Sequence, residues 1–141
     1  MNRYALVLIV GSFTFFVTSV IANDVSTYRI SKIIDGRLVT DEGLAISLYG
    51  LQFPDSAENP VEFKQAIDQL QALVLPGQVR LDASLFKEMG AEKNRYGDWH
   101  GKIVNNSGTW VQKELVEKGF VWWSGAAKYP KKIRAALVAA E

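Results

Sequence analysis

Residues 28–54 read YRISKIIDGRLVTDEGLAISLYGLQFP, and they carry the clearest structural pattern in the chain. Within them, segments of alternating and β-branched residues are separated by the turn sequences Asp35-Gly36 and Asp41-Glu42-Gly43, and Pro54 closes the last segment. Such turns between such segments are typical of antiparallel strands joined in sequence. The sequence therefore predicts a meander of three strands, over 28–34, 38–39 and 45–51.

Outward from this meander, the chain predicts two further strands and three helices. Asn59-Pro60 is typical of a helix start and Pro76-Gly77 of a helix end. Between them apolar residues recur at helical spacing, at Phe63, Ile67, Leu70 and Val74. The other expected elements are strands over 79–86 and 99–104 and helices over 110–118 and 133–140. Five short strands with two to three helices suit an α+β fold built on a closed five-stranded β-barrel of the OB type.

The first 22 residues differ from the rest of the chain. Arg3 is their only charge, residues 5–21 form an uncharged apolar run, and Ala22 follows small and apolar residues that suit a cleavage site. These are the three parts of a secretory signal peptide, and the small and polar residues within the run favour it over the alternative of an uncleaved membrane anchor. We expect residues 23–141 to form one exported domain, periplasmic or secreted.

Composition restricts the function of this domain. The chain has no cysteine, which excludes a disulfide scaffold, a thiol nucleophile and thiolate metal ligands. Of 16 basic residues the predicted signal peptide contains Arg3, which leaves 15 against 15 acidic residues. Proteins that bind nucleic acid usually have an excess of basic residues, so this neutral balance does not favour nucleic acid as a partner. We interpret one basic cluster as the solvated face of the last helix: Lys128, Lys131, Lys132 and Arg134.

Four local motifs occur in a fixed order. They are Asp35-Gly36-Arg37-Leu38, Ser47-Leu48-Tyr49-Gly50-Leu51-Gln52-Phe53-Pro54-Asp55, Asn94-Arg95-Tyr96-Gly97-Asp98, and Val111-Gln112-Lys113-Glu114-Leu115-Val116-Glu117-Lys118-Gly119. As a set, they resemble the staphylococcal-nuclease-like (thermonuclease) family over residues 28–136. The corresponding family forms are Asp-Gly-Asp-Thr, Arg-Leu-x-Gly-Ile-Asp-Ala-Pro-Glu, Asp-x-Tyr-Gly-Arg and Val-Asn-x-x-Leu-Val-x-x-Gly.

The scaffold positions of these motifs match the family, and the resemblance implies its barrel fold. The matching residues are Gly36, Leu48, Gly50, Pro54, Tyr96, Gly97, Leu115 and Gly119. We expect Gly36 and Gly50 to have a positive φ or to lie where a side chain would clash.

The chemical positions do not match. The resemblance implies phosphodiester cleavage with one calcium ion on two aspartates, a glutamate that assists water attack, and two arginines on the phosphate. This chain has Arg37 and Gln52 at the aspartate positions, and Ser47 and Asp98 at the arginine positions. Only the glutamate position keeps a carboxylate, as Asp55. Calcium prefers several oxygen ligands, so we expect no metal here unless the family mechanism survives in another form.

Other arrangements of the same residues remain open. Asp98 and His100 lie two apart on an expected strand and would share a face, as a carboxylate and an acid–base histidine do. The alternative, which we favour, is a surface histidine near a turn. Arg37 and Asp98 are also expected to form a salt bridge across the family's site.

The run Phe120-Val121-Trp122-Trp123 predicts an extended segment that buries alternate side chains. Its aromatic residues either pack in the core, which we favour, or contact a partner from the surface.

The sequence leads to one hypothesis and two alternatives. We expect an inactive domain of thermonuclease type that binds a protein or other ligand. The first alternative is a nuclease on DNA or RNA with an atypical site that uses Asp55 and Asp35. The second is an oligonucleotide binder that does not cleave. Membrane contact is expected only if residues 1–22 are retained.

Overall fold

The computed structural model describes residues 25–48, 50–75, 77–87, 90, 92–124 and 131–141. The expected signal peptide lies outside these residues. The elements along the chain are β1 (Val25–Ile34), β2 (Arg37–Thr40), β3 (Ala45–Ile46), β4 (Leu51–Gln52), α1 (Pro60–Val74), β5 (Gln78–Asp82), α2 (Ser84–Lys87), β6 (Lys102–Asn105), α3 (Val111–Glu117), β7 (Trp122–Trp123) and α4 (Lys131–Val138).

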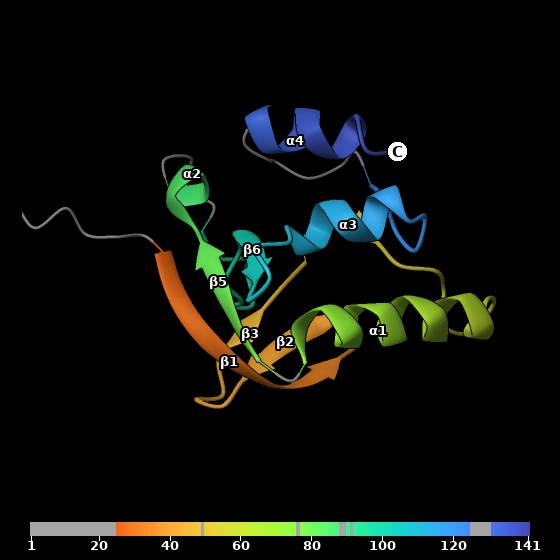
Figure 1. The fold of residues 1–141 in the computed structure, drawn as a ribbon, viewed down its shortest axis with the longest axis horizontal. Coiled ribbons are helices and arrows are strands. Elements are labelled where there is room, and N and C mark those ends of the chain that lie inside the picture. Colours follow the sequence, from red (N-terminus) through yellow and green to blue (C-terminus); the bar gives the residue numbers. More distant parts are fainter. Residues whose placement is uncertain (1–24, 49, 76, 88–89, 91, 125–130) are drawn as a thin grey trace, which may run out of the picture.

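Strand β1 is shared between two antiparallel ladders. Its first half, Val25 to Arg29, pairs with β5, and its second half, Ile30 to Ile34, pairs with β2. The register is irregular at Ser31, whose Oγ donates a hydrogen bond to the carbonyl oxygen of Val39 at 3.0 Å. A local irregularity of this kind bends a strand, so one strand can serve both halves of the sheet (Figure 1).

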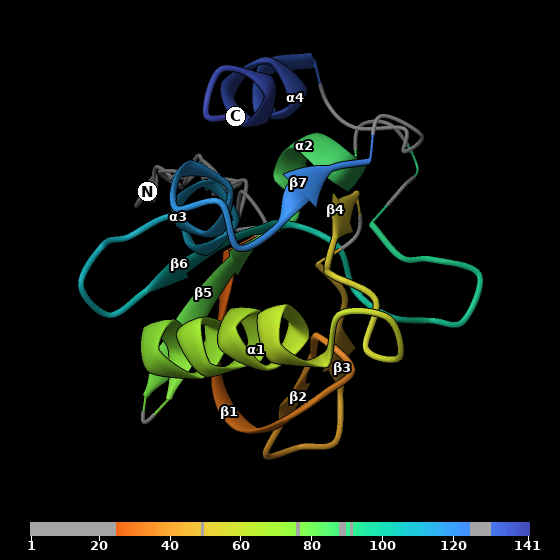
Figure 2. The same ribbon diagram turned by 90° about the vertical axis from the view of Figure 1, so that its right-hand side faces the viewer.

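The sheet has five strands in the order β3-β2-β1-β5-β6, and every pairing between neighbours is antiparallel. The α+β class expected from the sequence is therefore confirmed. An isolated parallel bridge joins Ile46 of β3 to Trp99, which precedes β6, but no ladder between β3 and β6 closes the described sheet into a barrel. β4 and β7 form a separate two-stranded sheet, which can be followed in Figure 2.

The expected third strand over 45–51 is wrong, because the chain turns within it. β3 ends at Ile46, and Gly50 has a φ of +86°. The backbone N–H of Leu51 donates to the carbonyl oxygen of Leu48 at 3.1 Å. This turn redirects the chain, so that Leu51 and Gln52 pair with β7 instead. Glycine permits the left-handed backbone that the turn needs.

The last two expected strands are shorter than the sequence suggests. β5 ends at Asp82, whose Oδ1 accepts hydrogen bonds from the backbone N–H and the hydroxyl of Ser84, and α2 starts there. β6 begins at Lys102 rather than at residue 99, because Trp99 is held by bridges to Ile46 and Lys93. A polar side chain that binds the backbone two residues later ends a strand and favours a helix start.

The three expected helices are present, with small differences at their ends. α1 matches residues 60–74, with Pro60 in its first turn, and Leu75 is already extended. α3 covers most of residues 110–118 and is followed by Gly119 at a φ of +72°. α4 starts two residues earlier than expected. α3 contacts both α1 and α4, and the three helices form a stack beside the sheet (Figures 1 and 2).

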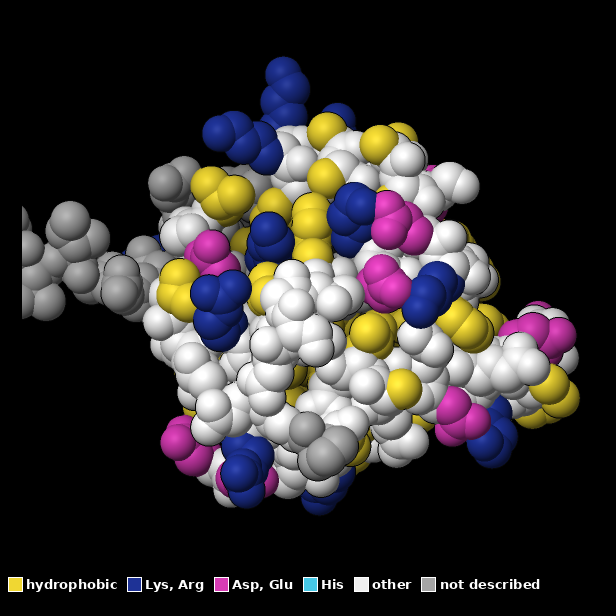
Figure 3. All heavy atoms as spheres, in the orientation of Figure 1, with side chains coloured by type: hydrophobic (Ala, Val, Ile, Leu, Met, Phe, Trp, Pro, Cys, Tyr) yellow, Lys and Arg dark blue, Asp and Glu magenta, His cyan; other side chains and the backbone are white. Residues whose placement is uncertain are grey.

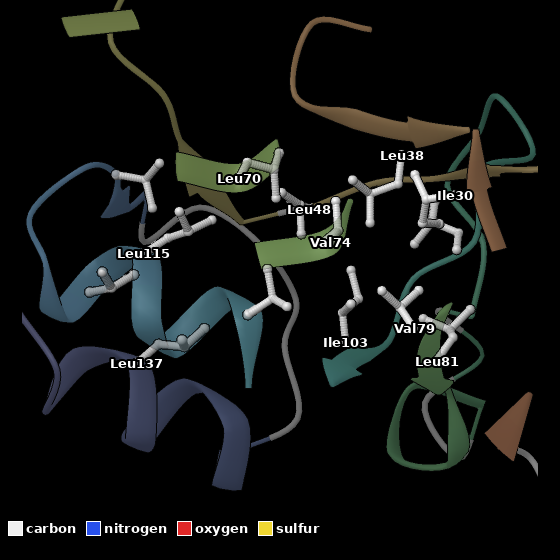
Figure 4. Packing of buried hydrophobic residues seen from close by; sticks show 14 of the residues in the cluster. Ile30, Leu38, Leu48, Leu70, Val74, Val79, Leu81, Ile103, Leu115 and Leu137 are labelled. Carbon is white, nitrogen blue, oxygen red and sulfur yellow. The ribbon is translucent and has the colours of Figure 1, made fainter. Parts of the chain in front are cut away.

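One hydrophobic core joins the sheet to the helices. Figure 4 shows side chains from the strands converging with Leu70 and Val74 of α1, and with Leu115 and Leu137 of the other two long helices. Each of these leucines is fully buried. Burying such a side chain contributes about 1.5–3 kcal/mol, and the chain has no cysteine that could add a disulfide to this packing.

A buried glutamine connects α3 to the approach of β6. The side chain Oε1 of Gln112 accepts hydrogen bonds from the backbone N–H of Ile103 at 3.0 Å and from Nε1 of Trp110 at 3.1 Å. Its Nε2 donates to the carbonyl oxygen of Gly101 at 2.7 Å. All three partners would lose a hydrogen bond without this side chain, so the amide fixes the position of α3 on the sheet.

Candidate functional site

The turn between β1 and β2 begins the site. Asp35 and Gly36 both have positive φ, +49° and +76°, and the turn places Arg37 as the first residue of β2. A Cβ on Gly36 would lie 3.0 Å from the ring of Phe53, so a glycine is needed here for space as well as for backbone conformation. The expectation for Gly36 is confirmed. The ring of Phe53 therefore covers the turn that carries Asp35 and Arg37.

Arg37 and Asp98 form the expected salt bridge. Nη2 of Arg37 lies 2.8 Å from Oδ1 of Asp98, and Nδ2 of Asn94 donates to the other carboxylate oxygen at 3.0 Å. Asp98 is 5% exposed, whereas the Arg37 side chain is 48% exposed. Each carboxylate oxygen thus has a donor, and a buried negative charge is stabilised by a cation at the surface.

A tight loop holds Asp98 in place. Oδ1 of Asn94 accepts hydrogen bonds from the backbone N–H groups of Tyr96 and Asp98, both at 2.9 Å. Gly97 has a φ of +84°, and its N–H donates to the carbonyl oxygen of Asn94. Sequence reasoning assigned no role to Asn94, whose side chain binds both the backbone and the carboxylate of this loop. Asparagine side chains often accept a hydrogen bond from the backbone two residues later in turns, and this tendency was the sequence signal that could have identified Asn94.

Ser47 follows β3, whereas Gln52 lies in β4. The backbone N–H of Ser47 donates to the carbonyl oxygen of Trp99 at 2.9 Å, which places Ser47 beside the residue that follows Asp98. Gln52 is exposed in β4, where it pairs with Trp122. The structure therefore brings Arg37, Ser47 and Asp98 into one neighbourhood, while Gln52 belongs to the separate small sheet.

Asp55 binds its own loop. Its Oδ1 accepts hydrogen bonds from the backbone N–H groups of Ala57 at 2.7 Å and Glu58 at 2.9 Å. The bond from Glu58 and then that from Ala57 lower the pKa of this carboxyl below the ordinary value of aspartate. Asp55 is fully ionised near neutral pH, and one of its oxygens stabilises the chain that leads into α1.

These side chains do not fit a calcium ion. Calcium takes six to eight oxygen ligands. The position of the family's first aspartate is occupied here by Arg37, a cation that is already paired with Asp98. Of the remaining carboxylates, Asp55 gives one oxygen to backbone donors. Within the part of the chain that the structure describes, no three Asp, Glu or His side chains are grouped as metal ligands would be.

The expected surface position of His100 is wrong. His100 is only 3% exposed, and its ring meets the ring of Phe86 in α2 edge-on, with centroids 6.2 Å apart. Residues 98–100 lie before β6 rather than on a strand, and the Asp98 carboxylate is bound by Arg37 and Asn94. The two side chains have different surroundings, which does not support an Asp–His acid–base pair.

The aromatic run divides between core and surface. Val121 is buried, and Phe120 and Trp123 pack partly against the core. Trp122 is 42% exposed and borders an open groove of about 480 Å³, together with Pro54, Phe120 and residues of α1. Core packing thus describes most of the run, and Trp122 is its surface member.

Basic residues of α4 face outward. Lys131, Lys132 and Arg134 are exposed, and Figure 3 shows Lys and Arg side chains in dark blue above this helix. Lys128 lies outside the described residues. The exposed positions agree with the interpretation of a solvated face. No helix in the described ranges is long and apolar enough to cross a membrane.

Comparison with models of protein families and with curated proteins found no match to this chain. The resemblance to the staphylococcal-nuclease-like family therefore rests on the four sequence motifs. The geometry of the site is independent of that resemblance: an arginine and a buried aspartate are paired beside a glycine turn that a phenylalanine ring covers.

Proposed function

We propose that this chain is an exported domain of thermonuclease type that does not cleave phosphodiesters and acts by binding a protein or other ligand. The Arg37–Asp98 ion pair carries the proposal. At the aligned positions, the family mechanism requires a negative group for calcium and a positive group for phosphate. Here both charges are reversed: Arg37 would repel calcium, and Asp98 would repel phosphate. The two side chains also pair with each other, which leaves neither charge free for a ligand.

The same proposal includes the closure of the sheet into a barrel. We take the sheet to be an OB-type barrel in which the Ile46–Trp99 bridge is the point of closure. Two backbone hydrogen bonds support this reading, from Trp99 N–H to the carbonyl of Ala45 and from Ser47 N–H to the carbonyl of Trp99, both 2.9 Å. A strand that bends to serve two ladders, as β1 does, is also expected of a small barrel.

The groove beside Trp122 supports a protein as the ligand. Its lining combines apolar surface from Pro54 and Phe120 with one acid, Glu62, and one base, Lys118. An exposed tryptophan is common at the centre of protein interfaces. Nucleic acid would need an excess of positive charge along its path, which this mixed lining lacks. A protein segment of mixed charge fits it better.

The first test is a cleavage assay. Purified protein is incubated with single-stranded DNA and excess calcium, magnesium or manganese, beside an Asp55→Ala variant. No cleavage is expected from either protein. Cleavage by the wild type that disappears in Asp55→Ala would overturn the proposal in favour of an atypical nuclease. A parallel calcium titration should leave Tm unchanged, since a ligand that binds the folded state raises it by mass action.

The second test rebuilds the site. Arg37→Asp with Asp98→Arg keeps an ion pair but restores the charges of the family, and Gln52→Asp adds the second carboxylate. This triple variant should gain a calcium-dependent rise in Tm that the double variant shows more weakly. A triple variant that folds but ignores calcium would mean that the motifs are misaligned.

The third test separates protein from oligonucleotide binding. Fluorescence anisotropy of a labelled single-stranded oligonucleotide should show no binding at physiological salt. Saturable binding that is lost in Trp122→Ala would refute the preference for protein and support the oligonucleotide-binding alternative.

A further inference from the structure

A small cavity shares no described lining residue with the groove or with the Arg37–Asp98 pair. It occurs where the start of β1 and the end of β5 meet below α2 (Figure 1), and its volume is about 210 Å³. Tyr28 of β1 and Trp99 contribute aromatic surface, and Leu81 and Ala83 contribute aliphatic surface. Glu92 and Lys87 are the charged residues in its described lining. A concave, mostly apolar space with a few polar groups is typical of small-ligand sites.

Glu92 gives this cavity its chemistry. Its Oε2 is buried and has no hydrogen-bond partner among the residues that the structure describes. A carboxylate oxygen withdrawn from water without a donor destabilises a protein more than a neutral group does, and native structures rarely leave one so. A donor that enters the cavity from solution would satisfy this oxygen.

The backbone around Glu92 is fixed. Its carbonyl oxygen accepts a hydrogen bond from the N–H of His100 at 2.8 Å, and the next residue, Lys93, forms an antiparallel bridge with Trp99. This short pairing holds the carboxylate and the indole on adjacent segments. A binding group held by backbone pairing loses little entropy when a ligand arrives.

The aromatic surface favours a cation. The ammonium of Lys93 lies 4.2 Å from the ring centroid of Trp99, which shows that this indole already attracts a positive charge. Tyr28 supplies a second ring, and its strand is held by pairing with Val79 of β5. A carboxylate together with two aromatic rings is the combination that binds ammonium groups in proteins.

From these observations we infer that the cavity binds a small primary amine. The ammonium group donates to Oε2 of Glu92, and a compact apolar body contacts Tyr28, Trp99 and the aliphatic floor. Lys87 also lines the cavity and is itself engaged in an interaction. Its positive charge disfavours any ligand that has a second cationic group. The inference does not depend on the proposed function, since none of these residues belongs to the Arg37–Asp98 site.

Calorimetric titration of the full chain with benzylamine tests this site, with benzyl alcohol as the uncharged control. Saturable binding in the millimolar range is expected for a ligand of this size, and benzyl alcohol should bind at least about tenfold more weakly. Equal binding of both compounds would overturn the inference, as would no saturable binding of benzylamine, which would leave only water beside Glu92.

Two variants locate the binding. Glu92→Gln removes the charge and should weaken benzylamine binding about tenfold or more. Ala83→Leu fills the cavity without touching the carboxylate and should abolish binding while the protein still unfolds cooperatively. Glu58→Gln, an exposed acid elsewhere, is the matched control and should bind as the wild type does. Unchanged binding in either cavity variant would refute the assignment.

Discussion

Replacing Arg37 by methionine should destabilise the protein by an amount between those of surface and buried ion pairs. Breaking a buried pair costs about 3–5 kcal/mol, whereas an exposed pair contributes at most about 1 kcal/mol. Here the Asp98 side chain is 7% exposed and the Arg37 side chain 48%, so water replaces only part of the lost contact. We expect a loss of about 1.5–3 kcal/mol, the range for a hydrogen bond to a charged group. Tm should fall by about 5–15 °C.

Urea unfolding followed by tryptophan fluorescence measures this loss. A double-mutant cycle with Asp98→Ala should give a coupling energy of about 1–2 kcal/mol. Lys64→Met removes the cation of an exposed helical pair with Asp68 and should cost no more than about 0.5 kcal/mol. If Arg37→Met costs no more than this control, and the coupling is within about 0.5 kcal/mol of zero, Arg37 does not stabilise Asp98. The proposed neutralisation of the site by this ion pair would then be refuted.

Three further predictions concern stability. Gln112→Leu should cost at least about 3 kcal/mol in chemical denaturation, because it leaves two backbone groups and one indole N–H without their partner. Asp55→Asn should lower stability near neutral pH. The lowered folded-state pKa of Asp55 means that its contribution is present above the ordinary aspartate pKa and disappears as pH falls through the folded value, so melting curves of wild type and variant should converge in acid. Gly36→Ala should lower Tm more than Gly108→Ala, because both have positive φ but only the first would meet the ring of Phe53.

Local signals in the sequence predicted most elements, and tertiary pairing decided the others. Pro60 and the spacing of Leu70 and Val74 gave α1 its correct bounds. The break at Gly50 could not be read in the same way, because the residues around it have strand character on both sides. What divides them is pairing of Leu51 with Trp123, about 70 positions later in the chain. Such distant partners leave no local pattern.

The site could be predicted only in part, because some of its contacts also depend on segments that are distant in the chain. Opposite charges at Arg37 and Asp98 were sufficient to expect a salt bridge, and the structure contains it. The burial of His100 could not be inferred, because one histidine beside a turn has no periodic pattern to assign it to a face. Its packing against Phe86 depends on α2, a helix of four residues that the sequence suggested as strand.

The division of β1 between two ladders has a consequence for how the domain opens. Val25 to Arg29 hold β5 and Ile30 to Ile34 hold β2, so detachment of this one strand releases both neighbours at once. Backbone amides of β2 and β5 should therefore exchange with deuterium at similar free energies, as one cooperative unit, although no ladder joins the two strands directly.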